Sequence, residues 1–312
     1  MNTLSTILTA GFKRCNLHRQ TSTRLKRPWI SLDRGVSQAE IIITMPLYPK
    51  LEIADPRELL EIEGFEDAYR NRCQAAKINH VKFLGPGDSF SFVCRRLNTC
   101  CRNFYDAERI NLDPYDVYRL SRFKKMSTGK FIEKYASMIL DKETHLPMVL
   151  LKYQGEEGKN KCHFLRSYGC SVYKDRPLRC RLYPLGKISS KDKSYFMLVN
   201  NCPCGDCGDG KNWSVADWID ESECRPYFEF QRLTIDILED YDREVYETLP
   251  EDVKLRFGVM LFDLDAMIAE LPSGQKPKNE RELRDHLSRR IDEFLASYGC
   301  LKRSKSEAAA PV

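Results

Sequence analysis

The sequence lacks any long hydrophobic run. Its most apolar helical stretch, from Phe257 to Leu271, is interrupted by Asp263 and Asp265, and no segment approaches the ~20 apolar residues that a helix needs to cross a bilayer. The first 30 residues also lack the apolar core of a secretory signal. We therefore expect a soluble protein with no membrane span. Its 42% hydrophobic residues can form a sizeable core and exclude wholesale disorder.

Acidic residues are missing from the first 32 positions, which carry six Lys or Arg and many Ser and Thr. This composition is typical of an organellar transit peptide. The alternative is that translation begins at Met45 and that the upstream segment is untranslated or disordered. Under either interpretation residues 1–44 form an extension outside the fold. We expect a cytoplasmic protein, or an organellar one if the extension is a transit peptide.

The rest of the chain has no surplus of positive charge. Residues 1–44 hold seven basic and two acidic side chains, which accounts for the whole formal net charge of +5. The remaining residues sum to zero and lack the basic excess of a groove that follows phosphates. We expect no nucleic-acid partner, and an unknown protein as partner or substrate.

Several cofactor motifs are also missing. No G-x-G-x-x-G opens a helix after a strand, as a Rossmann-type site requires. A zinc ribbon has two C-x2-C knuckles, but only Cys204 and Cys207 show that spacing. The ferredoxin run C-x2-C-x2-C is absent, as is the C-x3-C-x2-C arrangement of radical enzymes that use S-adenosylmethionine. Any metal site must therefore be assembled from distant segments.

Cysteine itself is abundant, with 13 residues in 312. The odd count and the missing secretory signal favour a reducing compartment, where clustered thiols bind metals or carry out redox chemistry. Nine of the cysteines fall into three groups: Cys94, Cys100 and Cys101; Cys162, Cys170 and Cys180; and Cys202, Cys204 and Cys207. The other four (Cys15, Cys73, Cys224 and Cys300) stand apart, and we expect them to be small buried hydrophobes.

The grouped cysteines lie among Gly, Asn, Arg and Pro, which are residues of irregular loops. Thiolates at about 2.3 Å from a metal ion can fix a backbone that has no regular hydrogen-bond ladder. We therefore expect a metal-binding protein, and the spacing permits both zinc and an iron–sulfur cluster.

The remaining pattern predicts an α+β fold: an irregular cysteine-rich metal-binding core with short strands, wrapped by helices, and a C-terminal helical segment packed on it. Residues 45–225 form the predicted metal-binding domain, 226–300 the helical segment and 301–312 a mobile tail. The predicted elements are a short strand over 90–94, a helix that starts at Asp113-Pro114, a second from Ser127-Thr128 to Leu140, a hairpin of 146–153 with 161–165, and three amphipathic helices whose apolar positions span 230–245, 253–271 and 283–294.

Two segments resemble a known family. FVCRRLNTCCRNF is followed by CHFLRSYGCSVYKDRPLRCRLYP, which has the form C-x7-C-x-x-Y-x-x-RP-x-x-CR-x-YP. Together they are similar to the YkgJ-type CxxCxxCC cysteine-cluster proteins, described as zinc- or iron-chelating. The resemblance runs from about Phe90 to Ser222 and extends over the stretch NCPCGDCGDGKNWSVADWIDES.

The chain departs from the family pattern at one point. Leu97 occupies the position of the second motif cysteine, and Asn98 stands where the family has Gly. Three thiols remain where the motif has four, so one four-thiolate site is favoured over two sites. We expect its ligands to come from Cys94, Cys100, Cys101, Cys162, Cys170 and Cys180, with Cys202 in reserve.

The resemblance implies little about activity. Some family members are labelled iron–sulfur oxidoreductases, and the flagellin lysine N-methylases carry a related cysteine cluster. Two hypotheses follow: a redox or protein-modifying enzyme that depends on an iron–sulfur cluster, or a structural zinc module that binds a partner without catalysis. Catalytic and other cofactor-binding residues are unknown from the sequence.

Charged and aromatic residues flank the predicted ligands. The arginines Arg176, Arg179 and Arg181 bracket Cys180 and could lower thiolate pKa values, neutralise an anionic cluster, or form salt bridges on a loop surface. We expect Tyr173 and Tyr183 to pack under the loop. His163 could be a mixed ligand, although a structural role is the more frequent one for a lone histidine.

Overall fold

A computed structural model describes residues 52–61, 81–94, 110–142, 144–154, 161–189, 193–199 and 210–301. The predicted extension, residues 1–44, lies outside these ranges, as do positions 302–312 of the predicted tail. None of the helices in the described ranges has the length and apolar character to cross a membrane.

The fold is α+β, as predicted. The helices are α2 (Arg57–Leu60), α5 (Pro114–Phe123), α6 (Thr128–Tyr135), α7 (Leu178–Leu182), α8 (Val215–Glu221), α9 (Arg225–Asp240), α10 (Arg243–Thr248), α11 (Glu251–Phe262), α12 (Leu264–Glu270) and α13 (Glu280–Ser297), with 3-10 turns η1 (Tyr173–Asp175) and η2 (Ser273–Gln275). The strands are β1 (Val81–Leu84), β2 (Ser89–Phe92), β3 (Asn111–Leu112), β4 (Ala136–Leu140), β5 (Pro147–Leu151), β6 (Tyr153–Gln154), β7 (Lys161–Cys162), β8 (Leu165–Arg166), β9 (Gly169–Cys170), β10 (Leu185–Ser189), β11 (Ser194–Val199) and β12 (Lys211–Ser214).

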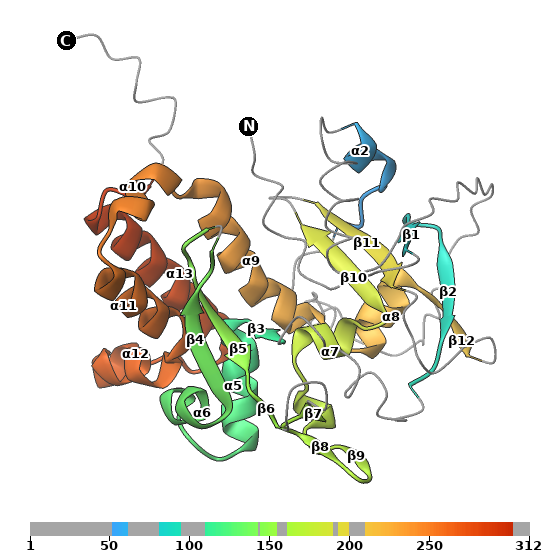
Figure 1. The fold of residues 1–312 in the computed structure, drawn as a ribbon, viewed down its shortest axis with the longest axis horizontal. Coiled ribbons are helices and arrows are strands. Elements are labelled where there is room, and N and C mark those ends of the chain that lie inside the picture. Colours follow the sequence, from blue (N-terminus) through green and yellow to red (C-terminus); the bar gives the residue numbers. More distant parts are fainter. Residues whose placement is uncertain are drawn as a thin grey trace, which may run out of the picture.

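These strands form small antiparallel sheets, in the orders β1-β11-β10, β12-β2, β3-β5-β4, β6-β7 and β8-β9. Helices α10 to α13 gather on one side of the molecule with α5 and α6, while β1, β2, β10, β11 and β12 lie on the other (Figure 1). The two-residue strands β6 to β9 extend from the end of β5, at the bottom of that view.

The helix predicted at Asp113-Pro114 is confirmed. Asp113 is the N-cap of α5, Pro114 is its first residue, and the backbone N–H of Asp113 donates to Asp116 Oδ2 at 2.9 Å in a capping box. The second predicted helix is shorter than expected. Helix α6 ends at Tyr135, because residues 136–140 pair along their whole length with β5.

The predicted hairpin is only partly correct. Strand β5 pairs with β3 and β4 rather than with residues 161–165, and its alternate residues Pro147, Val149 and Leu151 are buried. Only Tyr153 and Gln154 pair with the return strand, at Cys162 and Lys161. The apolar face of β5 is satisfied by its sheet and by α11, which packs on it. The cysteine-bearing strands are therefore left short.

The C-terminal segment contains five helices rather than the three predicted, because two of the predicted helices are interrupted, at Tyr241 and at Asp263. Asp263 caps α12 through its side chain, which accepts from the N–H of Ala266. The same carboxylate accepts from Thr128 Oγ1 at 2.6 Å and from the Gly129 N–H at 3.1 Å. This contact fixes the start of α6 against α12.

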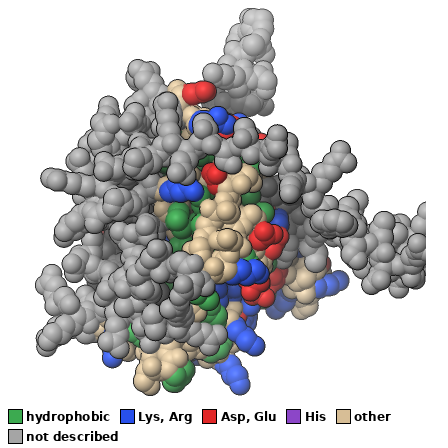
Figure 2. All heavy atoms as spheres, turned by 90° about the vertical axis from the view of Figure 1, so that its right-hand side faces the viewer, with side chains coloured by type: hydrophobic (Ala, Val, Ile, Leu, Met, Phe, Trp, Pro, Cys, Tyr) green, Lys and Arg blue, Asp and Glu red, His purple; other side chains and the backbone are tan. Residues whose placement is uncertain are grey.

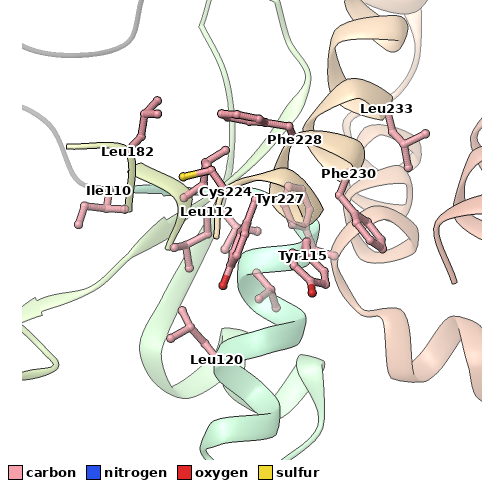
Figure 3. Close-up of a cluster of buried hydrophobic side chains, with 14 of the residues drawn as sticks. Ile110, Leu112, Tyr115, Leu120, Leu182, Cys224, Tyr227, Phe228, Phe230 and Leu233 are labelled. Carbon is pink, nitrogen blue, oxygen red and sulfur yellow. The ribbon is translucent and has the colours of Figure 1, made fainter. Parts of the chain in front are cut away.

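A layer of aromatic rings joins α5 to α9. The Tyr115 ring stacks on Phe230 and meets Tyr227 edge-on, with ring centroids 4.7 Å apart in both pairs. Figure 3 shows these rings beside Leu112, Leu182 and Cys224. One hydrophobic core contains these residues and continues to Leu287 and Ile291 of α13. Burial of aromatic side chains of this size is a large part of the stability of such a core.

Replacing Gly129 with alanine is expected to destabilise the fold. An added Cβ would lie 2.3 Å from Asp263 Oδ2, and that carboxylate is held in place by three donors. We expect a loss of about 1–3 kcal/mol of unfolding free energy, typical of overpacking, measured by urea denaturation. Gly87→Ala is the control, because its Cβ would meet nothing within 4 Å. Equal stability of the two variants would contradict the described contact.

Candidate metal centre

Four of the seven predicted ligands lie in the described part of the chain. Cys94 is exposed, Cys170 and Cys180 are half-buried and Cys162 is buried; none of these four forms a disulfide. Cys100, Cys101 and Cys202 lie outside the described residues. Among the residues that the structure describes, no three His, Cys, Asp or Glu side chains converge closely enough to hold a metal ion. At most two of the described thiols can therefore share one ion in this arrangement, and a four-thiolate site would take at least two ligands from outside the described residues.

Cys162 lies at the end of β7, where two backbone amides approach its sulfur. Burial raises the pKa of the Cys162 thiol to about 11, whereas hydrogen bonds from the N–H groups of Phe164 and Leu165 oppose the increase. N–H groups that face a sulfur stabilise the thiolate, which is the form that binds a metal. A bound metal cation would also stabilise the thiolate and so lower the pKa of Cys162.

Cys170 is brought close to Cys162 by the turn between them. Strand β8 pairs with β9, so that Leu165 faces Cys170, and the N–H of Ser171 donates to the carbonyl of Phe164 at 2.9 Å. A negative charge on Cys170 raises the pKa of Cys162 further, as expected for two thiols that lie near one another. These two predicted ligands are therefore neighbours in the fold.

Cys180 lies in the short helix α7, whose start is fixed by a buried carboxylate. The N–H of Leu178 donates to Asp116 Oδ1 at 2.8 Å, which ties α7 to α5. After the helix, the Tyr183 ring meets Phe92 edge-on with centroids 5.8 Å apart. Phe92 precedes Cys94 by two residues, so the segments that carry Cys94 and Cys180 lie side by side.

The described residues that follow Cys202 in the chain, from Gly210 onward, pair with the strand that precedes Cys94. Strand β12 pairs with β2, with Lys211 opposite Phe92, and Ser91 Oγ donates to the carbonyl of Gly210 at 2.8 Å. Gly210, the first described residue after the third cysteine group, therefore lies beside the segment that ends at Cys94.

Arg181 follows Cys180 and is buried, with 1% of its surface exposed. Its guanidinium donates to the carbonyls of Arg176 at 3.0 Å and Ser222 at 3.0 Å, and also to the carbonyl of Lys174. It packs over the Tyr227 ring, 4.7 Å from the centroid. The prediction of salt bridges on a loop surface is wrong for Arg181: although it pairs with Glu223 at 3.2 Å, its main role is to hold the loop between Cys170 and Cys180.

The other residues that flank the predicted ligands form contacts with one or two neighbouring groups each. Arg176 donates to the carbonyl of Tyr173 at 2.7 Å and lies 4.1 Å above that ring. The Tyr183 ring packs on Phe92, as expected. His163 Nδ1 accepts from the Gln154 amide at 3.0 Å, and burial followed by neighbouring cations lowers the pKa of the imidazole. This hydrogen bond is the structural role expected for a lone histidine.

A half-buried polar network beside α7 is not apparent from the sequence. Lys187 donates to Gln231 Oε1 at 3.0 Å and also to Ser189 Oγ, while Gln231 Nε2 donates to Asp113 Oδ2 at 3.3 Å. Burial lowers the pKa of Lys187 to about 7 and raises the pKa of Asp113. The partners come from β10, α9 and the start of α5, so no local spacing could have indicated them.

Replacing Lys187 with methionine is expected to change how stability depends on pH. The pKa of Lys187 is about 7 in the folded protein and 10.5 as the ordinary value, so between these values the unfolded chain binds the extra proton. The unfolding free energy of the wild type therefore increases as pH rises from 7 to 10, and decreases as pH falls through the same range. Between pH 6.5 and 9.5, we expect the unfolding free energy of the variant to increase by about 2–4 kcal/mol less than that of the wild type, measured by urea denaturation. Parallel pH dependences of the two proteins would contradict the lowered pKa of Lys187.

Comparison with known proteins agrees with the chemistry of these residues. Residues 93–205 match the CxxCxxCC family. That family's description reads "Putative zinc- or iron-chelating domain". The match spans a little over a third of the chain and includes all seven predicted ligands. No curated protein and no solved structure matches this chain.

Proposed function

We propose that this protein binds zinc or iron through four thiolates drawn from Cys94, Cys100, Cys101, Cys162, Cys170, Cys180 and Cys202, with the neighbouring Cys162 and Cys170 as two of them. The observation that carries the proposal is that the β8–β9 turn returns Cys170 to the neighbourhood of Cys162, whose sulfur has two backbone N–H groups against it. All seven cysteines belong to the segment that matches a zinc- or iron-chelating family.

The metal would hold together a part of the fold that has little regular structure. Strands β6, β7, β8 and β9 contain two residues each, and strands this short form few ladder hydrogen bonds and have little stability of their own. Metal–thiolate bonds supply folding free energy directly. The same residues would thus act as ligands and as cross-links between loops.

The six cysteines in the described ranges are all free thiols. Free thiols of this number are typical of a reducing compartment, which supports a cytoplasmic location.

Two activities follow from the two metals. An iron–sulfur cluster would serve an oxidoreductase or a cluster-dependent protein-modifying enzyme, whereas zinc with four thiolates would be a closed structural site in a module that binds a partner.

Metal analysis of protein purified without oxygen, from a chain starting at Met45, tests the proposal. We expect about one equivalent of zinc, or iron with matching acid-labile sulfide and absorption near 400 nm. Iron with sulfide would support the redox hypothesis, and colourless protein with stoichiometric zinc would support the structural module. Protein that folds with neither metal, and takes up neither on reconstitution, would overturn the proposal.

A further inference from the structure

Three cations surround one aromatic pair beside the cysteine turn. The Tyr135 and His163 rings meet edge-on with centroids 4.7 Å apart. The ammonium groups of Lys124 and Lys134 lie 5.3 and 5.4 Å from the centroid of Tyr135. The Arg166 guanidinium reaches the same pair, because it donates to the carbonyl of His163 at 2.9 Å. The three positive charges therefore belong to one surface, which we call the Tyr135 surface.

Two of these cations are held in position before any partner binds. The Arg166 guanidinium donates to the carbonyls of His163 and Leu165, both at 2.9 Å. The Lys124 ammonium lies over two rings, Tyr135 and Phe164, the second at 5.6 Å. Side chains that are already ordered lose less entropy on binding an anion than free ones do. The geometry thus suits them to recognition.

The positive charge of this surface is not neutralised by the described residues. Among the described residues, neither Lys124, Lys134 nor Arg166 forms an ion pair with a carboxylate. On another face of the molecule, shown in Figure 2, the basic and acidic side chains of described residues lie interspersed. Like charges gathered without a counter-charge raise the free energy of the free protein, and an anionic partner would lower it.

We propose that the Tyr135 surface binds a short acidic segment of a partner protein, with Lys124, Lys134 and Arg166 pairing with its carboxylates. One exposed aromatic side chain follows Arg166 in the chain. Tyr168, 74% exposed, lies at the turn between β8 and β9, two residues after Arg166. Aromatic residues beside arginine are typical of protein–protein hot spots.

A nucleic acid fits the surface less well. Specific and non-specific binding to DNA commonly uses about 6–10 phosphate contacts along a basic track, whereas this surface offers three cations. The chain from residue 45 onward also has no net positive charge. A peptide with a few carboxylates matches both the number and the extent of the positive groups.

Fluorescence anisotropy with a labelled octaglutamate peptide tests the proposal on full-length, metal-containing protein. We expect saturable binding at low salt that weakens at higher salt. The double variant Lys124→Glu and Lys134→Glu should bind at least about tenfold more weakly, because it replaces two attractive pairs by repulsive ones. The matched control, Lys276→Glu with Lys278→Glu, changes the net charge equally at two exposed positions and should stay within about twofold.

A second double variant and a DNA probe complete the test. Lys124→Gln with Lys134→Gln removes the charges without adding repulsion, and it serves if the reversed variant does not fold; a loss of about threefold is expected. Absence of saturable binding, or equal losses in the double variant and the control, would overturn the proposal. An eight-nucleotide single-stranded DNA that binds more tightly than the peptide would overturn it in favour of a nucleic-acid surface. None of these variants touches a predicted metal ligand.

Discussion

Cys170→Ser protein is expected to lose its bound metal. Serine offers a hard hydroxyl oxygen in place of a soft thiolate, and zinc and iron–sulfur sites depend on sulfur ligands. Cys170 faces Leu165 across the β8–β9 turn and lies close to Cys162, so its loss also leaves Cys162 without its partner. We expect less than a tenth of the wild-type metal content after purification, measured by elemental analysis.

Loss of metal should destabilise the protein as well. Metal binding to structural thiolate sites contributes about 10 kcal/mol or more in small domains, and we expect the variant to unfold at clearly lower temperature than the wild type. Cys300→Ser is the matched control. Cys300 is buried and its thiol donates to the carbonyl of Tyr298 at 3.6 Å, a contact that a serine hydroxyl can keep, so metal content should not change. Full metal retention in Cys170→Ser would contradict the proposed ligand set.

The second large effect is expected from Arg181→Met. Methionine fills much of the same volume but removes the donors that serve the carbonyls of Lys174, Arg176 and Ser222. Buried polar groups left without a partner cost about 1–3 kcal/mol each, although such losses do not simply add. We expect a decrease of about 3–5 kcal/mol in unfolding free energy, measured by urea denaturation of the metal-containing protein.

Arg181→Met should also weaken metal binding, because Lys174 and Arg176 lie between Cys170 and Cys180. Outer contacts that orient ligands are commonly worth about 10- to 100-fold in metal affinity, which a competing chelator can measure. Arg256→Met is the control. Arg256 forms an exposed pair with Asp252 one helical turn away, and such pairs contribute at most a few tenths of a kcal/mol. A stability loss below about 1 kcal/mol for Arg181→Met would show that the loop does not depend on this guanidinium.

Features that depend on neighbouring residues could be predicted from the sequence. Asp113 and Pro114 specify the start of α5, because an N-cap and a first-turn proline act through the adjacent backbone. The periodic apolar residues of the last third likewise predicted helices, although the breaks at Tyr241 and Asp263 were not expected. Asp263 ends one helix because it caps the next and also contacts α6, and the second contact involves residues 134 positions away.

The cysteine site shows the same division. Grouped thiols in loops, together with the CR-x-YP string, indicated a metal-binding protein and its candidate ligands without any structure. The sequence could not show that the β8–β9 turn brings Cys170 near Cys162, or that the segment that ends at Cys94 lies beside the segment that carries Cys180. Those relations depend on the pairing of β2 with β12 and on the packing of Phe92 against Tyr183.

The burial and the partners of charged side chains could be predicted least well from the sequence. Arg176, Arg179 and Arg181 have similar neighbours in the sequence, yet Arg181 is buried with its guanidinium against the carbonyls of Arg176 and Ser222, whereas Arg176 and Arg179 are half-buried. Lys187 meets Gln231 and Asp113 only after β10, α9 and α5 have packed. The sequence by itself determined the thiol chemistry and the helices, because these arise from residue type and local spacing. The tertiary structure decided which charges are buried and which cysteines meet, because desolvation and long-range packing exist only in the folded chain.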